Sequence, residues 1–146
     1  DWTPAIATDS NGQVHIGWDT YDKGNYDVML RSWSGSAWSE PDAIADTAKF
    51  EAGVSLACDN ENRLWATWGE AGMDWGKDTG FLPRKQGTPL YRDRWMGVAV
   101  RAGGRWTEPT VDVNASLPAA IRDHNDRPVL ATAGDGRVWL LFRHRN

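Results

Sequence analysis

The sequence has a single cysteine, no long apolar run and no excess of positive charge. Cys58 is alone among 146 residues, so an internal disulfide is excluded, and its alternating apolar surroundings predict a buried small residue. No apolar stretch approaches the roughly 18 residues that a membrane-spanning helix needs, and no basic-then-apolar signal segment opens the chain. The net charge of −4 disfavours nucleic acid as a partner.

Helical periodicity and the common catalytic and metal-binding motifs are missing as well. No segment repeats its apolar residues at helical spacing. There is no glycine-rich phosphate loop, no Cys/His zinc spacing and no Gly-x-Ser-x-Gly nucleophile elbow. Segment 19–27 spaces its oxygen-bearing side chains loosely like a calcium loop, but it lacks the terminal bidentate Glu, so turn capping is favoured. We therefore expect neither a cofactor nor a bound metal.

Tryptophan, by contrast, is abundant, with 10 in the chain. Each indole buries a large apolar area and carries one N–H donor. Repetition of such residues at matched positions suggests a repeat architecture, whereas aromatic rings stacked on a surface would suggest sugar binding.

Three segments, 4–18, 54–68 and 128–142, align without gaps. Ile6, Leu56 and Leu130 each precede an apolar residue by eight positions and an aromatic residue by twelve. The middle of each segment is rich in Gly, Asn and Asp, which favour tight hairpin turns, and the flanks alternate as half-buried strands do. Each segment is therefore predicted to be a β-hairpin, with strands A and B.

A second hairpin, with strands C and D, follows twice, at 27–41 and 96–109. In this alignment Arg31 matches Arg101, and Trp38 matches Trp106.

Four-stranded antiparallel units at this period predict an all-β fold, a partial β-propeller. Its parts are blade 1 at 4–44, blade 2 at 53–112 with an insert loop at 69–95, and half of blade 3 at 128–143. A closed propeller usually has about 4–8 blades. The remaining blades of a longer parent chain are the expected partner, and assembly of several copies is the alternative.

The repeat resembles the blades of sialidase-like propellers with BNR-type repeats. The resemblance rests on Pro/Val-x-h-Ala-x-Asp-x-x-Gly in the first hairpin and on Gly-x-x-Trp-Ser/Thr-Glu-Pro in the second, where h is an apolar residue. The chain departs from the full Asp-box, of which 9–12 and 104–107 keep only parts. Such propellers are common in secreted and cell-surface bacterial proteins, so the resemblance implies a secreted, periplasmic or cell-surface location. The long-loop region is also similar to blades that precede a metal-dependent, phosphoesterase-like domain, and no such domain lies in this sequence.

Strand order predicts a molecule with two different faces. The A–B and C–D turns are short and share one face, whereas the long connections 19–26, 69–95 and 113–127 share the other. Long loops in compact domains are usually functional, so the site is expected on the second face.

Aromatic and charged side chains gather in two of these connections. Aromatic faces stack on sugars, while carboxylates and guanidinium groups hold hydroxyls and carboxylates. The candidate ligand-binding residues are Glu70, Asp74, Trp75, Tyr91, Arg92, Asp93, Arg94, Arg122, Asp123 and His124. The alternative is that the charges pin an ordinary loop, the aromatics plug its underside, and 122–127 is a solvated turn.

Three functions are consistent with the sequence. The first is a non-catalytic module that binds a glycan or a protein through the face with the long loops. The second is part of a sialidase-like glycoside hydrolase whose other active-site residues lie in missing blades. The third is a structural spacer in a large multidomain protein.

Overall fold

The computed structural model of the chain describes residues 1–73, 75 and 93–145. Its elements, in chain order, are β1 (Trp2–Thr8), β2 (Val14–Thr20), β3 (Asp27–Trp33), β4 (Asp42–Ala45), β5 (Phe50–Cys58), β6 (Leu64–Ala71), β7 (Trp95–Ala102), β8 (Arg105–Thr107), the short 3₁₀ helix η1 (Ala119–Ile121), β9 (Asn125–Thr132) and β10 (Val138–His144). Within these ranges no helix has the length and apolar character needed to cross a membrane.

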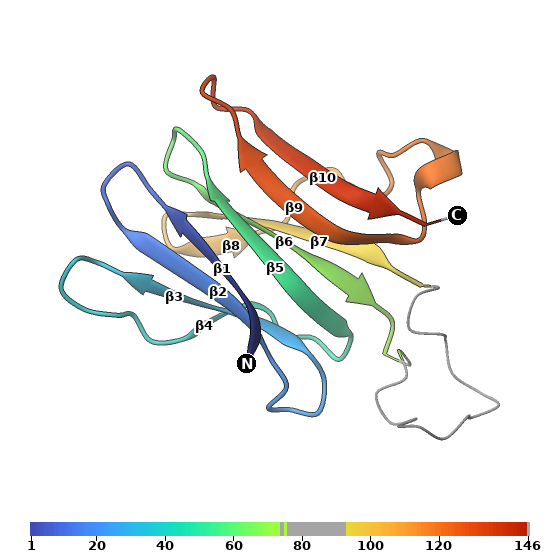
Figure 1. Cartoon of the computed structure of the whole chain (residues 1–146), viewed down its shortest axis with the longest axis horizontal. Coiled ribbons are helices and arrows are strands. Elements are labelled where there is room, and N and C mark those ends of the chain that lie inside the picture. Colours follow the sequence, from blue (N-terminus) through green and yellow to red (C-terminus); the bar gives the residue numbers. More distant parts are fainter. Residues whose placement is uncertain (74, 76–92, 146) are drawn as a thin grey trace.

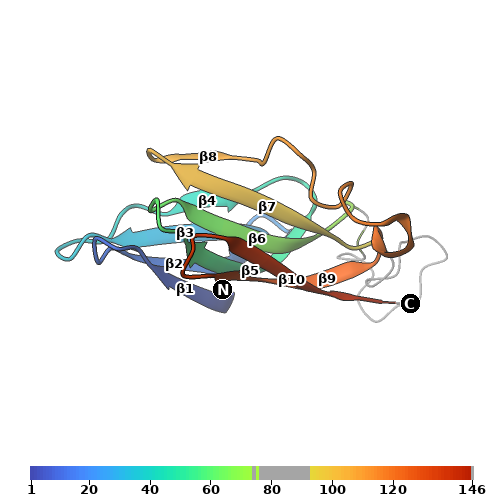
Figure 2. The same cartoon turned by 90° about the horizontal axis from the view of Figure 1, so that it is seen from above.

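The strands form three antiparallel sheets with neighbours in chain order. Strands β1–β4 make blade 1, β5–β8 make blade 2, and β9–β10 make half-blade 3. Figure 2 shows β1, β5 and β9 along one side of the molecule and β8 along the opposite side. The predicted all-β fold with four-stranded antiparallel blades is confirmed.

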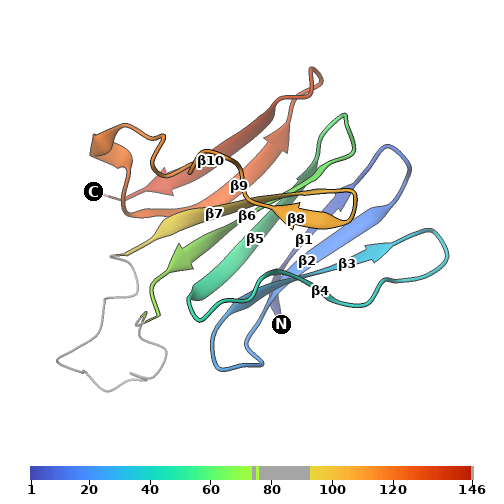
Figure 3. The same cartoon turned by 180° about the vertical axis from the view of Figure 1, so that it is seen from behind.

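The hairpin turns and the long connections lie at opposite ends of the strands. Figures 1 and 3 show the turns after β1, β5 and β9 together at one end, and the β2–β3 connection, the end of β6 and the start of β7 at the other. We call these the turn end and the loop end. The turns of adjacent blades also touch, since Ser10 donates from its backbone N and from Oγ to Asn62 Oδ1, at 2.9 and 2.8 Å.

Each inner strand contains the same bulge. The pairing register shifts between Trp2 and Ala5 in β1 and between Ala52 and Ser55 in β5, and a matching shift occurs where β9 pairs with β10. One residue at each shift is left-handed: Thr3 at φ 50°, Gly53 at φ 76° and Arg127 at φ 52°. The bulge inserts an extra residue and so interrupts the alternation of buried and exposed side chains. The inner strands therefore begin a few residues before the starts that the alternating pattern predicts.

A buried carboxylate ties this bulge to the preceding blade. Asp19 of β2, 3% exposed, accepts a hydrogen bond of 2.9 Å from the backbone N of Gly53 in β5. Burial raises the pKa of Asp19 above its usual value.

The main core lies between blades 1 and 2. Val28 and Leu30 of β3 face Val54 and Leu56 of β5, all of them buried, and Trp68 of β6 completes the cluster. Strand β5 lies against β1 and β2 on one side and against β9 on the other. The blades are therefore held together chiefly through their innermost strands.

The repeat places one apolar residue per blade against the blade before it. Leu56 and Leu130 are 7% and 8% exposed, because blades 1 and 2 cover them. The equivalent Ile6 in blade 1 is 67% exposed. On the opposite side, Val129 and Leu141 of half-blade 3 are also exposed. The three blades form an open arc. The outer faces of blade 1 and of half-blade 3, at the two ends of this arc, thus correspond to the faces that are buried where neighbouring blades pack together.

The β-strand registers correct two details of the sequence alignment. Val14 pairs with Trp33 and the equivalent Leu64 pairs with Arg101, so Arg101 corresponds to Trp33 and the match to Arg31 is wrong. The four-residue turns at 34–37 and 102–105 close hairpins of equal size, which fixes this offset. Pairing also extends into the predicted insert, because β6 continues to Ala71.

We predict that Leu56→Ala lowers the free energy of unfolding by about 2–5 kcal/mol, since it leaves a cavity between blades 1 and 2. Ile6→Ala removes a similar volume from the equivalent exposed position and is expected to cost about 0.5 kcal/mol. Urea denaturation of both variants measures the difference. Equal losses would contradict the assigned packing.

Gly53→Ala is predicted to destabilise the chain by about 1–2 kcal/mol, because an L-residue is strained at this positive φ. A Cβ there meets no atom within 4 Å, so steric overlap adds nothing. Gly134→Ala is the matched control, with open space and no positive φ, and is expected to be neutral or slightly stabilising. Thermal denaturation of both variants checks this, and an unchanged melting temperature for Gly53→Ala would count against the bulge.

Candidate functional site

A groove runs along blade 2 toward the loop end. It consists of two adjoining cavities of about 460 and 280 Å³. Both are lined by Lys49, Trp68, Glu70 and Glu108. We call the larger one, which also contains Trp95, the first cavity, and the smaller one, which contains Trp106, the second cavity.

Trp68 forms the boundary shared by the two cavities and is itself 5% exposed. Its indole lies directly over Gly97, where an added Cβ would come within 2.1 Å of the ring. Glycine is thus required at this position, because any side chain would displace the indole. The indole N–H of Trp68 has no hydrogen-bond partner among the described residues, which leaves one buried donor unsatisfied beside the groove.

An aromatic ring, a carboxylate and an ammonium group meet at the loop end of the first cavity. The indole N–H of Trp95 donates to Oε2 of Glu70. Lys49 Nζ lies 3.7 Å from the same oxygen and 6.0 Å from the centroid of the Trp95 ring. The pairing is possible because Glu70, one residue before the end of β6, lies directly opposite Trp95 at the start of β7. Trp95 is only partly buried and Lys49 is exposed, so both are accessible.

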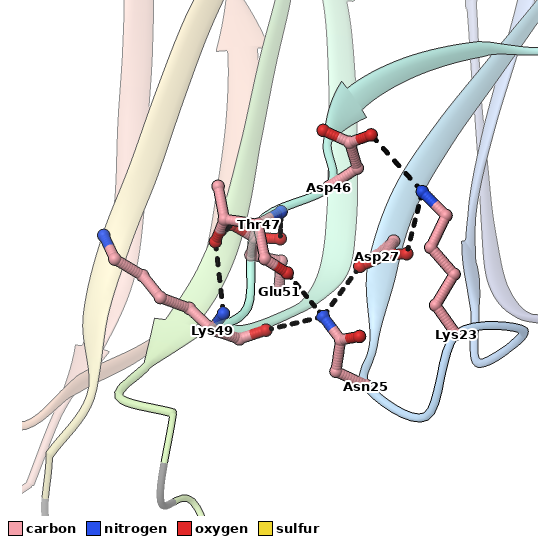
Figure 4. A network of polar contacts seen from close by, with 7 residues as sticks. All are labelled: Lys23, Asn25, Asp27, Asp46, Thr47, Lys49 and Glu51. Carbon is pink, nitrogen blue, oxygen red and sulfur yellow. Dashed lines mark hydrogen bonds and ion pairs between the residues drawn. The ribbon is translucent and has the colours of Figure 1, made fainter.

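The backbone that carries Lys49 is fixed by a network of polar contacts (Figure 4). The amide N of Asn25 donates to the carbonyl oxygens of Thr47 and Lys49 and to Oδ1 of Asp27, the last at 2.9 Å. Thr47 donates from its backbone N and its hydroxyl to the carboxylate of Glu51, at 3.0 and 2.6 Å. The turn between blades 1 and 2 is therefore held from both sides, which sets the position of Lys49.

Glu51 is the most deeply buried carboxyl group in this network, with 0% exposure. Burial raises its pKa, and Glu70 and Asp27 nearby raise it further, while the two hydrogen bonds from Thr47 oppose the shift. Burial likewise raises the pKa of Asp27, which is 1% exposed. Glu51 has no surface with which to touch a ligand, so its part in the groove is to hold the turn.

The outer wall of the first cavity is a segment that follows β8. The side chain of Asn114 makes the two hydrogen bonds that a neighbouring strand would make with Met96. Its Oδ1 accepts from the backbone N of Met96 at 3.0 Å, and its Nδ2 donates to the carbonyl of Met96 at 2.8 Å. Asp112 accepts a hydrogen bond of 2.8 Å from the backbone N of Asn114, which lowers the pKa of Asp112. These contacts fasten the wall to the edge of β7.

Blade 1 closes the second cavity. Its Asp42 accepts a hydrogen bond of 3.3 Å from the indole N–H of Trp106, and lies 3.2 Å from Nη2 of Arg101. Trp106 is thereby oriented at the joint between the blades, with part of its ring exposed.

Two of the sequence-predicted residues lie in an aromatic cluster rather than in the groove. Trp75 is 8% exposed and packs against Tyr26 and Phe50, with ring centroids 5.5 and 5.0 Å away. The guanidinium of Arg94, 7% exposed, lies 3.8 Å from the centroid of Phe50. Trp75 and Arg94 are therefore packed in the interior and do not line the groove.

The other predicted residues are divided between the groove and the surface. Glu70 lines both cavities. Asp93, Arg122, Asp123 and His124 are exposed, and none of them lines the groove. Asp74, Tyr91 and Arg92 lie outside the described residues.

Several groove residues were not among the predicted site residues. Trp68 and Trp106 stand at repeat positions, where a core role explains them equally well, and Lys49 lies in a short connection. The only sequence signal for the two tryptophans is the high tryptophan content of the chain, and Lys49 has no such signal. Within the described part of the chain, no set of three or more His, Cys, Asp or Glu side chains is placed to hold a metal ion.

No protein-family model and no curated protein matches the chain. Several solved structures have a similar fold, among them a lectin and a glycoside hydrolase. A fucose lectin from Kordia zhangzhouensis, in complex with methyl-fucoside, gives a TM-score of 0.52 at 12% identity, over 98% of this chain and 84% of the lectin chain. A thermostable family-43 glycoside hydrolase gives 0.57 at 10% identity, over 96% of this chain and 47% of the enzyme chain, so this chain spans about half of that enzyme. Both are β-propeller proteins, which confirms the partial propeller.

Glu51→Gln is predicted to change how stability depends on pH. The raised pKa of Glu51 means that its contribution to stability is present below its unfolded pKa, about 4.3, and is lost as pH rises through the folded value. Glutamine does not ionise, so the variant is expected to gain stability relative to the wild type as the pH rises above about 4.3. Melting temperatures in a series of buffers above this pH test it, and a constant difference would refute the buried charge.

Proposed function

We propose that the chain is a carbohydrate-binding propeller module whose ligand lies in the groove of blade 2. One observation carries the proposal: Trp95 is partly exposed beside a carboxylate and an ammonium group, in a cavity of about 460 Å³. Ligand sites typically measure about 300–1,000 Å³ and combine apolar walls with a few fixed polar groups.

The chemistry of the groove suits a sugar. The apolar C–H face of a pyranose stacks on an indole, while its hydroxyl groups donate to a carboxylate and accept from an ammonium group. Glu70 and Lys49 supply these two polar groups next to the Trp95 ring. The likeness to a lectin that was solved with methyl-fucoside supports the proposal at the level of the fold.

Binding is favoured over the glycosidase alternative. Glycoside hydrolases usually act through two carboxyl groups that flank the scissile bond. Glu51 is wholly buried and Arg94 is held against Phe50, so neither is positioned to contact a sugar in this groove. Among the described residues, Glu70 and Glu108 are the carboxylates that line both cavities and have exposed surface. Glu70 is already engaged by Lys49 and by the indole N–H of Trp95, which leaves Glu108 as the one uncommitted carboxylate of this pair.

We also propose that the exposed surfaces at the two ends of the arc are seats for further blades of a longer chain. The exposure of Ile6, where Leu56 and Leu130 are buried, supports this. The resemblance to BNR-type blades supports a secreted, periplasmic or cell-surface location.

Trp95→Ala is predicted to weaken glycan binding by on the order of tenfold or more, because a central tryptophan supplies much of the energy of such a contact. Glu70→Gln is expected to give a loss of about tenfold, since hydrogen bonds to a charged acceptor are the stronger ones. Binding is measured by quenching of tryptophan fluorescence against a glycan panel, with calorimetry for each sugar that responds.

Trp38→Ala is the matched control, because Trp38 is 42% exposed in the hairpin turn that closes blade 1 at the turn end. Its affinity is expected to equal that of the wild type. An equal loss in Trp38→Ala, or full binding by Trp95→Ala, would place the ligand elsewhere. Release of free sugar during the titration would favour the glycosidase alternative.

A further inference from the structure

Three tryptophans line the two adjoining cavities of the groove. Trp95 lines the first cavity, Trp106 lines the second, and Trp68 lines both. Four lining residues are common to the two cavities, so the cavities are direct neighbours on the protein surface. A groove with a partly exposed indole at each end offers two stacking places for sugar rings.

The charges along the groove are predominantly negative. The carboxylates of its described lining that have exposed surface are Asp46, Glu70, Glu108 and Asp112, whereas Lys49 is the one cation and no arginine is present. Lys49 is close to Glu70, Asp46 is paired with Lys23 at 3.4 Å, and Arg122 outside the lining acts on Asp112, but Glu108 has no cation in the described lining. A carboxylated or sulfated sugar would therefore be repelled, since like charges that approach across a partly dry surface cost free energy.

Besides its acidic groups, the groove has a buried hydrogen-bond donor without a partner in the described part of the chain. Trp68, which lines both cavities, is 5% exposed, and its buried indole N–H is unpartnered among the described residues. A buried donor without a partner carries a cost in free energy, which is removed when a small shift of the side chain lets it bond to an acceptor. A sugar hydroxyl or ring oxygen is an acceptor of the required kind.

We infer that the groove takes an oligosaccharide of at least two units, uncharged or amine-bearing, with one ring near Trp95 and another near Trp106. This rests on the proposed function, because it specifies the ligand of the same site. Carboxylates accept hydrogen bonds from the hydroxyls of neutral sugars and pair with ammonium groups of amino sugars, so both kinds fit the lining.

The experiment compares chain length and charge in separate series. Cello-, xylo- and chito-oligosaccharides, from the monosaccharide to the pentasaccharide, are titrated against the whole chain by calorimetry and tryptophan fluorescence. We expect at least one series to gain about tenfold in affinity from the monosaccharide to the trisaccharide, equivalent to about 1.4 kcal/mol. Glucosamine oligomers are expected to bind and galacturonate oligomers are not.

Glu108→Lys tests the charge selection directly, because Glu108 is exposed at the groove. The variant is expected to weaken glucosamine oligomers and to admit galacturonate oligomers. Glu40→Lys makes the same change of net charge at an exposed position outside the groove and is expected to alter neither.

The outcomes separate the two proposals. Equal affinity for the monosaccharide and the trisaccharide, or preferred binding of galacturonate by the wild type, would overturn the inference while the carbohydrate function stands. If Trp95→Ala lost binding but affinity did not depend on chain length, the groove would hold a single sugar ring. This outcome would also overturn the inference and leave the carbohydrate function standing. No response to any sugar in these series would refute the proposed function itself.

Discussion

The packing of one blade on the next is the interaction on which the rest of the structure depends. A four-stranded sheet buries little by itself, and the main buried apolar cluster of the described residues lies between blades 1 and 2. Leu56 and Leu130 occupy the same repeat position and are covered by the preceding blade in each case. The bulge with a left-handed residue in every inner strand recurs at the same place, and in blade 2 it is held by the buried carboxylate of Asp19.

The groove is a consequence of this packing. Two sheets that fan out from their inner strands leave space between their outer parts, and the turn at 46–49 lies at the loop end of that space. Asn25 and Glu51 hold this turn from opposite sides, which places Lys49 beside Glu70 and Trp95. A buried acid with a raised pKa is a costly way to fix a turn, and the pair of hydrogen bonds from Thr47 offsets part of that cost.

Tryptophan serves two different purposes in the chain. Trp75 is buried in an aromatic cluster with Tyr26 and Phe50. Trp95 is partly exposed at the groove, and Trp106 joins two blades while part of its ring stays exposed. Residue type alone does not separate these uses, because an indole serves equally well as a core plug and as a stacking surface.

The sequence by itself determined the local structure of this protein. Alternation and turn chemistry are short-range properties, and they were enough to predict the all-β fold, the four-stranded antiparallel blades, their hairpins and the two unlike ends. They placed Glu70 among the site residues, but they misaligned Arg31 with Arg101, because one loop offset shifts a strand without changing its pattern. The tertiary structure alone decided that Trp75 and Arg94 are buried, and that Lys49, Trp68, Trp95 and Trp106 share a groove. These four residues come from different strands and connections, and only the packing of one blade on another fixes the distances between them.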